Sequence, residues 1–164
     1  MSMFSKNKKI IKGVLASLII IGGGFIFFGI YLQFFVPIMP ECNAVIRTDY
    51  HDEKHSLSRV LFVSIVNINA RESAFIINGS VAYNNERFTI ARTISMTYTA
   101  NEGRFLLRPT NIVRRSNDDS HNNKEVDKLF PVVGKDILFT VEKINDQQYI
   151  FADNRSPNFI CNKR

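Results

Sequence analysis

Residues 88–99 read FTIARTISMTYT, and this stretch decides the fold class of the chain. Apolar residues occupy alternate positions, and threonine, serine and alanine fill the positions between them. The apolar positions are Phe88, Ile90, Ile94, Met96 and Tyr98. A period of two over a stretch of this length is typical of a β-strand with one buried face, and β-branched threonines suit the other face.

Similar apolar, β-branched runs lie on both sides of this strand. Residues 60–68 and 74–83 precede it, and residues 104–114 follow it. The polar segment 84–86 separates two of these runs, which is typical of a hairpin turn. Runs joined by such turns predict consecutive antiparallel strands.

A polar segment interrupts the series of strands. Residues 116–123 contain no apolar side chain and are expected to form a loop. The Asp-Asp-Ser triplet at 118–120 is suitable for capping a short helix over residues 124–130. A last hairpin is expected from residues 136–144 and 149–152. These elements predict a mainly β (α+β) fold, an antiparallel meander with one short helix that curls into a half-barrel or a small barrel.

The N-terminal part of the chain has the composition of a membrane anchor. Residues 13–36 carry no charged side chain, and four lysines lie just before them, within residues 6–12. A helix rises about 1.5 Å per residue, so this stretch is long enough to cross a hydrocarbon core of about 30 Å. Basic residues before the span place the N-terminus in the cytoplasm by the positive-inside rule.

We therefore expect a cytoplasmic tail over residues 1–12, a single transmembrane helix over residues 13–36 and an extracytoplasmic β-rich domain over residues 37–164. In a bacterium this topology places the protein in the inner membrane, with its C-terminal domain in the periplasm. A cleaved signal peptide shares the basic start. Its apolar region is usually shorter, about 7–15 residues, and residues 36–41 make a poor cleavage site.

Charge composition argues against nucleic acid as a partner. The chain has 21 Lys and Arg residues against 15 Asp and Glu residues, a net charge of +6. Four of the basic residues are the lysines before the apolar span, so the rest of the chain is close to neutral. A surface of this kind lacks the basic excess that is typical of nucleic-acid binding.

Cys42 and Cys161 are the two cysteines of the chain, and they bracket the predicted extracytoplasmic domain. Two such thiols in an oxidising compartment are expected to form a disulfide. A metal or redox pair is the alternative, but it usually needs closely spaced cysteines or further ligands. A disulfide that closes so long a loop would stabilise the fold by about 4–5 kcal/mol on the chain-entropy model.

Residues 51–55, HDEKH, look like a zinc-hydrolase motif at first sight. That mechanism needs a glutamate directly after the first histidine, and this chain has Asp52 there. The segment is also strongly polar, which predicts a solvated loop. Motifs for an activated nucleophile or a phosphate-binding loop are missing from the sequence too. We therefore expect no enzymatic activity, no catalytic or metal-binding residue and no cofactor.

The chain resembles the FidL-like small membrane proteins of enteric bacteria. The similarity lies in the lysine-flanked apolar segment, the cysteine that follows it, the β-rich remainder and the sequence PNFIC at residues 157–161. The resemblance implies a membrane-anchored partner, a transcription regulator of the ToxR type. The similar ToxS and VtrC proteins bind and stabilise the sensor domain of such regulators. Some of these pairs form a shared lipocalin-like barrel for bile salts.

Two functional hypotheses follow from the sequence and the resemblance. In the first, the protein is a single-pass accessory protein whose periplasmic domain binds the regulator's sensor domain as a heterodimer, through an unpaired strand edge. In the second, the domain is a lipocalin-like module for an apolar small ligand. The 14 phenylalanines of the chain could line such a cavity, although aromatic residues at strand spacing more often form a core.

Overall fold

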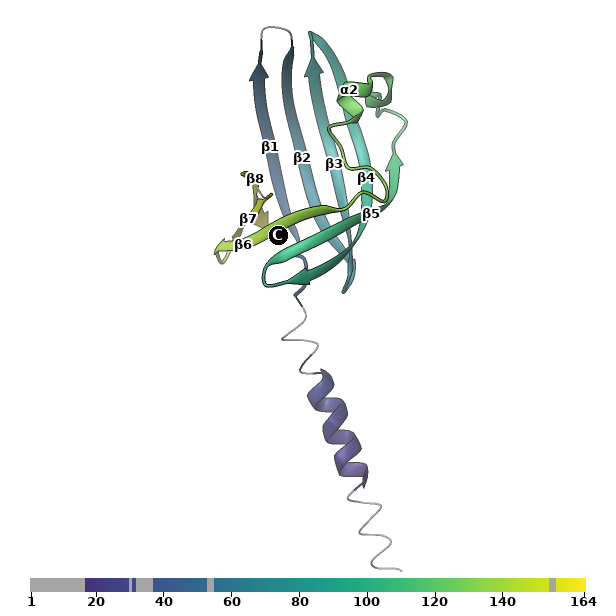
Figure 1. Ribbon diagram of the computed structural model, residues 1–164, viewed down its shortest axis with the longest axis vertical. Coiled ribbons are helices and arrows are strands. Elements are labelled where there is room, and N and C mark those ends of the chain that lie inside the picture. The colour runs from purple at the N-terminus through teal and green to yellow at the C-terminus, as the bar shows by residue number, and fades with distance from the viewer. Residues whose placement is uncertain (1–16, 30, 32–36, 53–54, 154–155) are drawn as a thin grey trace, which may run out of the picture. The chain divides into compact units, whose positions relative to one another are not determined.

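The structure, a computed structural model, describes residues 17–29, 31, 37–52, 55–153 and 156–164 (Figure 1). It consists of two units, with the boundary between Pro37 and Ile38. In the first unit, residues 17–29 form a helix.

Within the described part of the chain, no helix is both long enough and apolar enough to cross a membrane. The predicted span over residues 13–36 extends beyond the described helix, because residues 13–16, 30 and 32–36 lie outside the described residues. The predicted cytoplasmic tail over residues 1–12 lies outside them completely.

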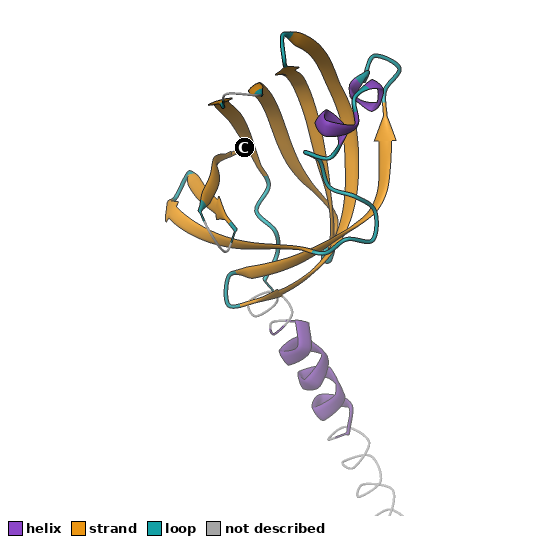
Figure 2. Cartoon of the chain, turned by 45° about the horizontal axis from the view of Figure 1, so that its top comes forward, coloured by secondary structure: helices purple, strands orange, loops and turns teal. Residues whose placement is uncertain are grey.

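The second unit is a closed β-barrel of eight antiparallel strands (Figure 2). Each strand pairs with the next one along the chain, and the last strand pairs with the first. The strands are β1 (Cys42–His51), β2 (Ser56–Asn69), β3 (Glu72–Tyr83), β4 (Glu86–Asn101), β5 (Arg104–Arg114), β6 (Ile137–Asn145), β7 (Gln148–Ala152) and β8 (Pro157–Lys163). This arrangement confirms the predicted antiparallel meander and shows that it closes into a barrel.

The periodicity of residues 88–99 is also confirmed. The five predicted core residues of β4 are all at most 7% exposed: Phe88, Ile90, Ile94, Met96 and Tyr98. Inward-facing residues of the other strands complete the core, among them Leu61, Val63, Ile65, Phe75, Ile77, Val81, Phe105, Leu107 and Phe151. The core therefore lies inside the barrel, where the alternating face of each strand is removed from water.

One expectation about local structure holds in part, and another is wrong. In the segment 51–55, Asp52 and His55 are exposed and lie outside any strand, as expected of a loop, whereas His51 is the last residue of β1, a strand that is not predicted from the sequence. The predicted helix over 124–130 is shorter, since α2 covers only Lys124–Asp127. Its cap is Asn123, whose side chain accepts hydrogen bonds from the backbone N–H groups of the first helical turn, and not the triplet at 118–120.

The barrel closes tightly at one end and stays open at the other. β2, β3 and β4 pair along almost their whole lengths. In contrast, β5 pairs with β6 only through Arg104–Leu107, and β1 pairs with β8 only through Cys42–Ala44. At the other end the long strands extend beyond the short strands β6–β8, as Figures 1 and 2 show.

The predicted disulfide between Cys42 and Cys161 is present at the closed end. Both cysteines are fully buried, and their Cα atoms are 5.5 Å apart. They lie on β1 and β8, the two strands that share only a short ladder. The disulfide therefore covalently supports the seam at which the first and last strands meet.

Gly79 allows β2 and β3 to approach each other closely. Its φ is +153°, a value that residues with a side chain rarely adopt. A Cβ atom at this position would lie 2.1 Å from the carbonyl oxygen of Val60 and 2.9 Å from the Cα of Leu61. Both atoms belong to the backbone of β2, so a side chain could fit only if the strand itself moved.

Replacing Gly79 by alanine should lower the free energy of unfolding by about 3 kcal/mol or more, because the new methyl group would separate two central strands. Urea unfolding of the full-length chain in a nonionic detergent measures this change. Gly134→Ala is the matched control, because Gly134 also has a positive φ, of 79°, but its Cβ would meet no atom within 4 Å. Equal losses for the two variants would contradict the role assigned to close strand approach.

Candidate functional site

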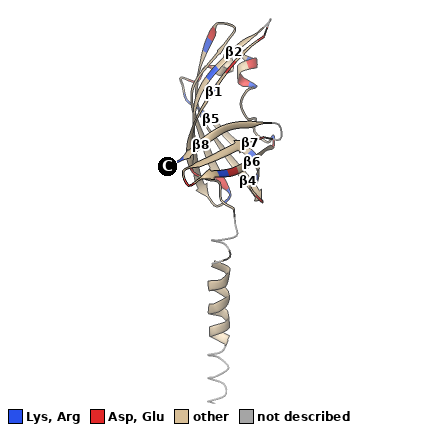
Figure 3. Ribbon diagram, turned by 90° about the vertical axis from the view of Figure 1, so that its left-hand side faces the viewer, with Lys and Arg blue, Asp and Glu red and all other residues tan. Residues whose placement is uncertain are grey.

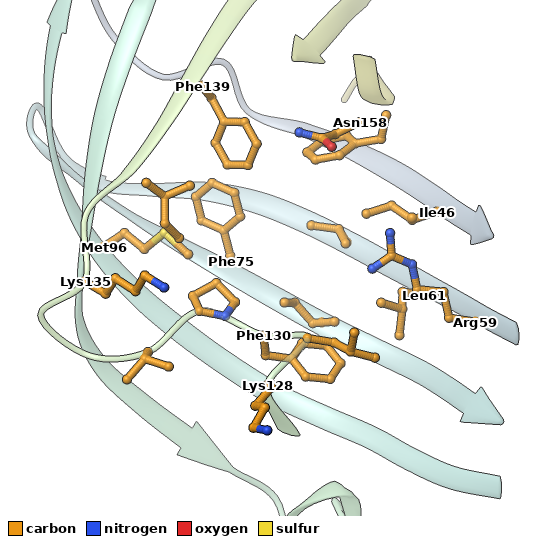
Figure 4. A pocket seen from close by; sticks show the side chains of 17 residues that line it. Ile46, Arg59, Leu61, Phe75, Met96, Lys128, Phe130, Lys135, Phe139 and Asn158 are labelled. Carbon is orange, nitrogen blue, oxygen red and sulfur yellow. The ribbon is translucent and has the colours of Figure 1, made fainter. Parts of the chain in front are cut away.

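A pocket of about 380 Å³ lies inside the open part of the barrel (Figure 4). Its walls come from β1–β4, from β6 and β8, and from the chain between β5 and β6. The lining residues are Ile46, Arg59, Leu61, Val63, Phe75, Ile77, Met96, Lys128, Leu129, Phe130, Pro131, Val132, Lys135, Ile137, Phe139, Asn158 and Phe159. Its volume is within the range of pockets that bind small molecules.

The lining is mainly apolar, and its charged groups all have the same sign. Arg59, Lys128 and Lys135 are cations, and no carboxylate belongs to the part of the lining that the structure describes. Figure 4 shows Arg59 beside Ile46 and Leu61, whereas Lys135 lies on another side of the pocket near Met96. An apolar chamber with basic groups at separate points can accommodate an apolar body and attract an anionic group.

Arg59 belongs to the inward-facing series of β2 that includes Leu61 and Val63, and its side chain is half-buried. Its Nε donates a hydrogen bond of 3.1 Å to the hydroxyl of Thr48 on β1. Burial lowers the pKa of the guanidinium. Among the described residues, no carboxylate lies within ion-pair distance of Arg59. The residue is therefore a partly desolvated cation without an anionic partner in that part of the chain.

Three aromatic side chains pack together at the pocket wall next to the closed end. Phe151 and Phe159 stack with ring centroids 4.8 Å apart, and Phe139 contacts both rings edge-on. Phe139 and Phe159 also line the pocket, whereas Phe151 is fully buried behind them. Edge-to-face and stacked contacts of this kind stabilise a rigid apolar wall.

The chain between β5 and β6, residues 115–136, covers one side of the pocket, and we call it the β5–β6 insertion. It contains the 3-10 helix η1 (Ser120–Asn122) and α2. Residues 128–132 and Lys135 of the insertion line the pocket. Because these residues form a wall of the pocket, the contacts that dock the insertion on the barrel also determine the pocket's shape.

A buried ion pair docks the insertion on β4. Arg92 is 1% exposed and lies on the inward face of the strand. Its Nε and Nη2 each donate a hydrogen bond of 2.8 Å to the carboxylate of Asp118, which is 3% exposed. Nη2 also donates to the hydroxyl of Ser120, and Nη1 lies 3.3 Å from a carboxylate oxygen of Asp127. Charge-assisted, two-point pairing of this kind fixes both position and orientation.

Asp118 and its neighbour Asp119 also satisfy backbone groups of β4. Asp118 accepts a hydrogen bond from the N–H of Ala91, and Asp119 accepts one from the N–H of Thr89. The ladder between β4 and β5 begins only at Arg92. The N–H groups of Thr89 and Ala91 therefore have no β5 residue opposite them. Carboxylate oxygens of the insertion therefore accept the hydrogen bonds that a neighbouring strand would accept at this edge of β4.

The Arg92 guanidinium connects the ion pair to the pocket. Its central carbon lies 4.3 Å from the centroid of the Phe130 ring, a cation–π contact. Phe130 is itself 6% exposed and lines the pocket. Arg92 therefore holds the insertion in place from one side and positions a pocket wall from the other.

Sequence patterns predict none of the three residues that matter most here in these roles. Neither Arg92 nor Arg59 is predicted as a site residue, and Asp118 is predicted only as part of a helix cap. One signal in the sequence could indicate Arg92, since it is a charged residue in phase with the apolar positions of residues 88–99. The pairing of Arg92 with Asp118 has no such signal, because 26 residues separate the two positions.

The two histidines of the segment 51–55 have different surroundings in the structure. His51 ends β1, and the ring of His55 stacks on Tyr83 of β3 at a centroid distance of 6.0 Å. Among the described residues, no group of three or more His, Cys, Asp or Glu side chains could hold a metal ion.

Charges of both signs are interspersed on the barrel (Figure 3), without a continuous basic stripe in that view.

Protonation of Asp118 should release the insertion. Burial raises the pKa of this carboxyl, but hydrogen bonds from Arg92, the Ala91 N–H and Ser120 outweigh it and lower the pKa to about 2. A lowered pKa stabilises the fold above the unfolded-state value of 3.8. We therefore expect this stabilisation to be lost as the pH falls from about 4 to about 2.

Asp118→Asn tests this assignment, because it keeps the shape of the side chain and removes its charge. It should lower the free energy of unfolding at neutral pH by about 3–5 kcal/mol, since Arg92 stays buried with a weaker partner. It should also flatten the acid limb of a plot of stability against pH.

The control is Asp136→Asn, which removes a carboxylate that pairs at two points with Arg108 on the surface. Exposed pairs contribute little, so this variant should resemble the unmodified protein at neutral pH. Similar losses at the two sites would show that burial of the Arg92–Asp118 pair is not what makes it important.

Comparison with known proteins gives a family assignment. A search of curated proteins finds no match. The model of a protein family described as "FidL-like putative membrane protein" matches residues 79–161. The matched region begins at Gly79 in β3 and ends at Cys161 in β8, so it includes both Arg92 and Asp118. The chain therefore belongs to the FidL-like family.

Proposed function

We propose that the barrel is a binding module for an apolar small ligand within a membrane-associated accessory protein. The observation that carries the proposal is the pocket of about 380 Å³, whose lining is mainly aliphatic and aromatic. A tightly packed small barrel would fill this space with its own side chains. The open end of the barrel leaves a route by which a ligand can enter.

We also propose that the protein acts by binding alone. The polar groups of the described pocket lining are one asparagine and three cations. General acid–base or nucleophilic chemistry usually relies on a carboxylate, histidine or nucleophile paired with a second group. The described lining supplies no such pair.

We propose that residues 13–36 anchor the chain in the membrane. The family is one of membrane proteins, which supports membrane association. The uncharged residues 13–36 and the lysines before them favour an anchor with its N-terminus in the cytoplasm. On this topology the barrel lies in the bacterial periplasm, an oxidising compartment that suits the disulfide.

A second candidate function is the binding of a membrane-anchored transcription regulator of the ToxR type as a heterodimer. The observation that favours it is the edge of β1, where Val45–His51 pair with β2 on one side and with no described strand on the other. An unpaired edge offers backbone N–H and C=O groups to a partner's strand. Two anchored partners would also meet at a high effective concentration, so a modest interface could stay occupied.

A tryptophan reporter tests the ligand-binding proposal, because the chain contains no tryptophan of its own. Phe159→Trp places the reporter in the pocket wall. In nanodiscs of phosphatidylcholine, a short-range brominated quencher, either ω-bromododecanol or ω-bromododecanesulfonate, should quench this reporter saturably at low concentration. The pocket limits the number of bound molecules, and this limit produces saturation.

Phe62→Trp is the matched control, because Phe62 lies on β2 with its side chain 57% exposed and does not line the pocket. Its quenching should rise only gradually, as the probe partitions into lipid. If neither probe quenches the Phe159→Trp reporter saturably, the barrel is not a ligand-binding module of this kind.

Site-specific photo-crosslinking in cells tests the second candidate. A benzoylphenylalanine in place of Tyr50, in the unpaired part of β1, should crosslink to a membrane-anchored transcription regulator that mass spectrometry identifies. The same probe in place of Ile144 on β6, a similarly exposed position, serves as the control. Identical products from the two positions, or products without a regulator among them, would contradict an interface at the β1 edge.

A further inference from the structure

We infer that Arg59 binds the head group of the ligand, so that the pocket selects amphiphiles with an anionic head over neutral ones with the same apolar body. This inference rests on the proposed ligand-binding function and specifies the class of ligand. The head group would be an organic anion such as a carboxylate or a sulfonate. The body would be an apolar chain that contacts the aliphatic and aromatic lining of the pocket.

The environment of Arg59 carries the inference. Its side chain leaves the strand on the inward face, next to Ile46 and Leu61 (Figure 4). Withdrawing a cation from water costs free energy unless an anion or several hydrogen bonds replace the water. Within the described residues, the hydrogen bond to Thr48 is the one polar contact that Arg59 makes. The guanidinium thus retains donors that can pair with an anion at two points.

Arg92 differs from Arg59 because it has carboxylate partners. Arg59 lies on the inward face of β2 and Arg92 on the inward face of β4. Arg92 forms hydrogen bonds or ion pairs with Asp118, Ser120 and Asp127. The fold therefore provides carboxylates where an inward arginine has a structural role. At Arg59 the described residues provide none, which leaves the position of the anion for a ligand.

The two lysines of the pocket are less suited to this task. Lys128 is exposed and already pairs with Glu125, 2.7 Å away. Lys135 is exposed in the β5–β6 insertion, where water can hydrate its ammonium group. An exposed, hydrated cation attracts an anion weakly, whereas a partly buried arginine interacts with it in a medium of lower dielectric constant. Both lysines can assist entry of the ligand without determining its head group.

The apolar lining of the pocket would contact the rest of the ligand. Phe75, Met96 and Phe130 lie among the labelled side chains of the pocket in Figure 4. With the anionic head at Arg59, the body would extend along these side chains. Burial of the body would supply most of the affinity, and the head group would supply the selectivity.

The tryptophan reporter at position 159 measures this selectivity in the full-length chain in phosphatidylcholine nanodiscs. The probes are ω-bromododecanesulfonate, which is anionic at all working pH values, and ω-bromododecanol, which has the same body and no charge. We expect the sulfonate to bind more tightly than the alcohol. Arg59→Met should reduce the ratio of sulfonate affinity to alcohol affinity about tenfold, the typical value of one charge-assisted hydrogen-bonded contact.

Two further variants control for charge and for folding. Arg47→Met removes a positive charge from the exposed face of β1, outside the pocket, and should leave the preference intact. Arg59→Lys keeps the charge without the two-point geometry and should keep part of the preference. Saturable quenching of the Arg59→Met variant by the alcohol shows that its pocket is still formed.

Three results would overturn the inference, and they differ in what else they overturn. Equal affinity for both probes before Arg59 is changed would remove the anion selectivity but leave the ligand-binding function standing. A preference that survives in Arg59→Met and disappears in Lys135→Met would move the head-group site to the lysine. Saturable quenching by neither probe would overturn the proposed function together with the inference.

Discussion

The buried pair between Arg92 and Asp118 is the interaction on which the rest of this structure depends. It joins the middle of the longest strand to a segment that has almost no regular secondary structure of its own. The insertion buries Val126 and Phe130 against the barrel core, but its residues 116–123 contain no apolar side chain, so hydrophobic packing cannot hold that part in place. The ion pair gives this polar part a directional contact, and the side chains of Asp118 and Asp119 also accept hydrogen bonds from N–H groups of β4. As a result, Phe130 is placed against Arg92 and one wall of the pocket is fixed.

The two ends of the barrel have different physical roles. At the closed end, short ladders, a disulfide and the stacked rings of Phe151 and Phe159 produce a conventional packed core. At the open end, the long strands extend beyond their partners, and the β5–β6 insertion covers only part of the interior. The pocket lies between the closed end and the open end, where side chains line the space without filling it. The strand lengths therefore set the position of the candidate site.

Much of the fold could be predicted from the sequence, because strand periodicity is a local property. The alternation of Phe88, Ile90, Ile94, Met96 and Tyr98 defines a buried face without reference to any other part of the chain. The strand β1 is harder to predict, since its last residues are polar and exposed at the open end. The candidate site is harder still. Whether Arg59 is solvated or enclosed depends on strands that are distant in sequence, and the partner of Arg92 lies in a loop whose composition indicates only solvent exposure.

The disulfide has a consequence for the integrity of the molecule. Cys42 and Cys161 lie 119 positions apart, so the covalent ring they close contains almost the complete barrel. A protease that cuts one exposed turn of the barrel, such as the insertion after β5, would therefore open a ring without releasing a fragment. The two pieces would stay joined through sulfur, and the strands on either side of the cut could remain paired. In the periplasm proposed for this domain, the barrel would tolerate a single backbone cleavage for as long as that bond remained oxidised.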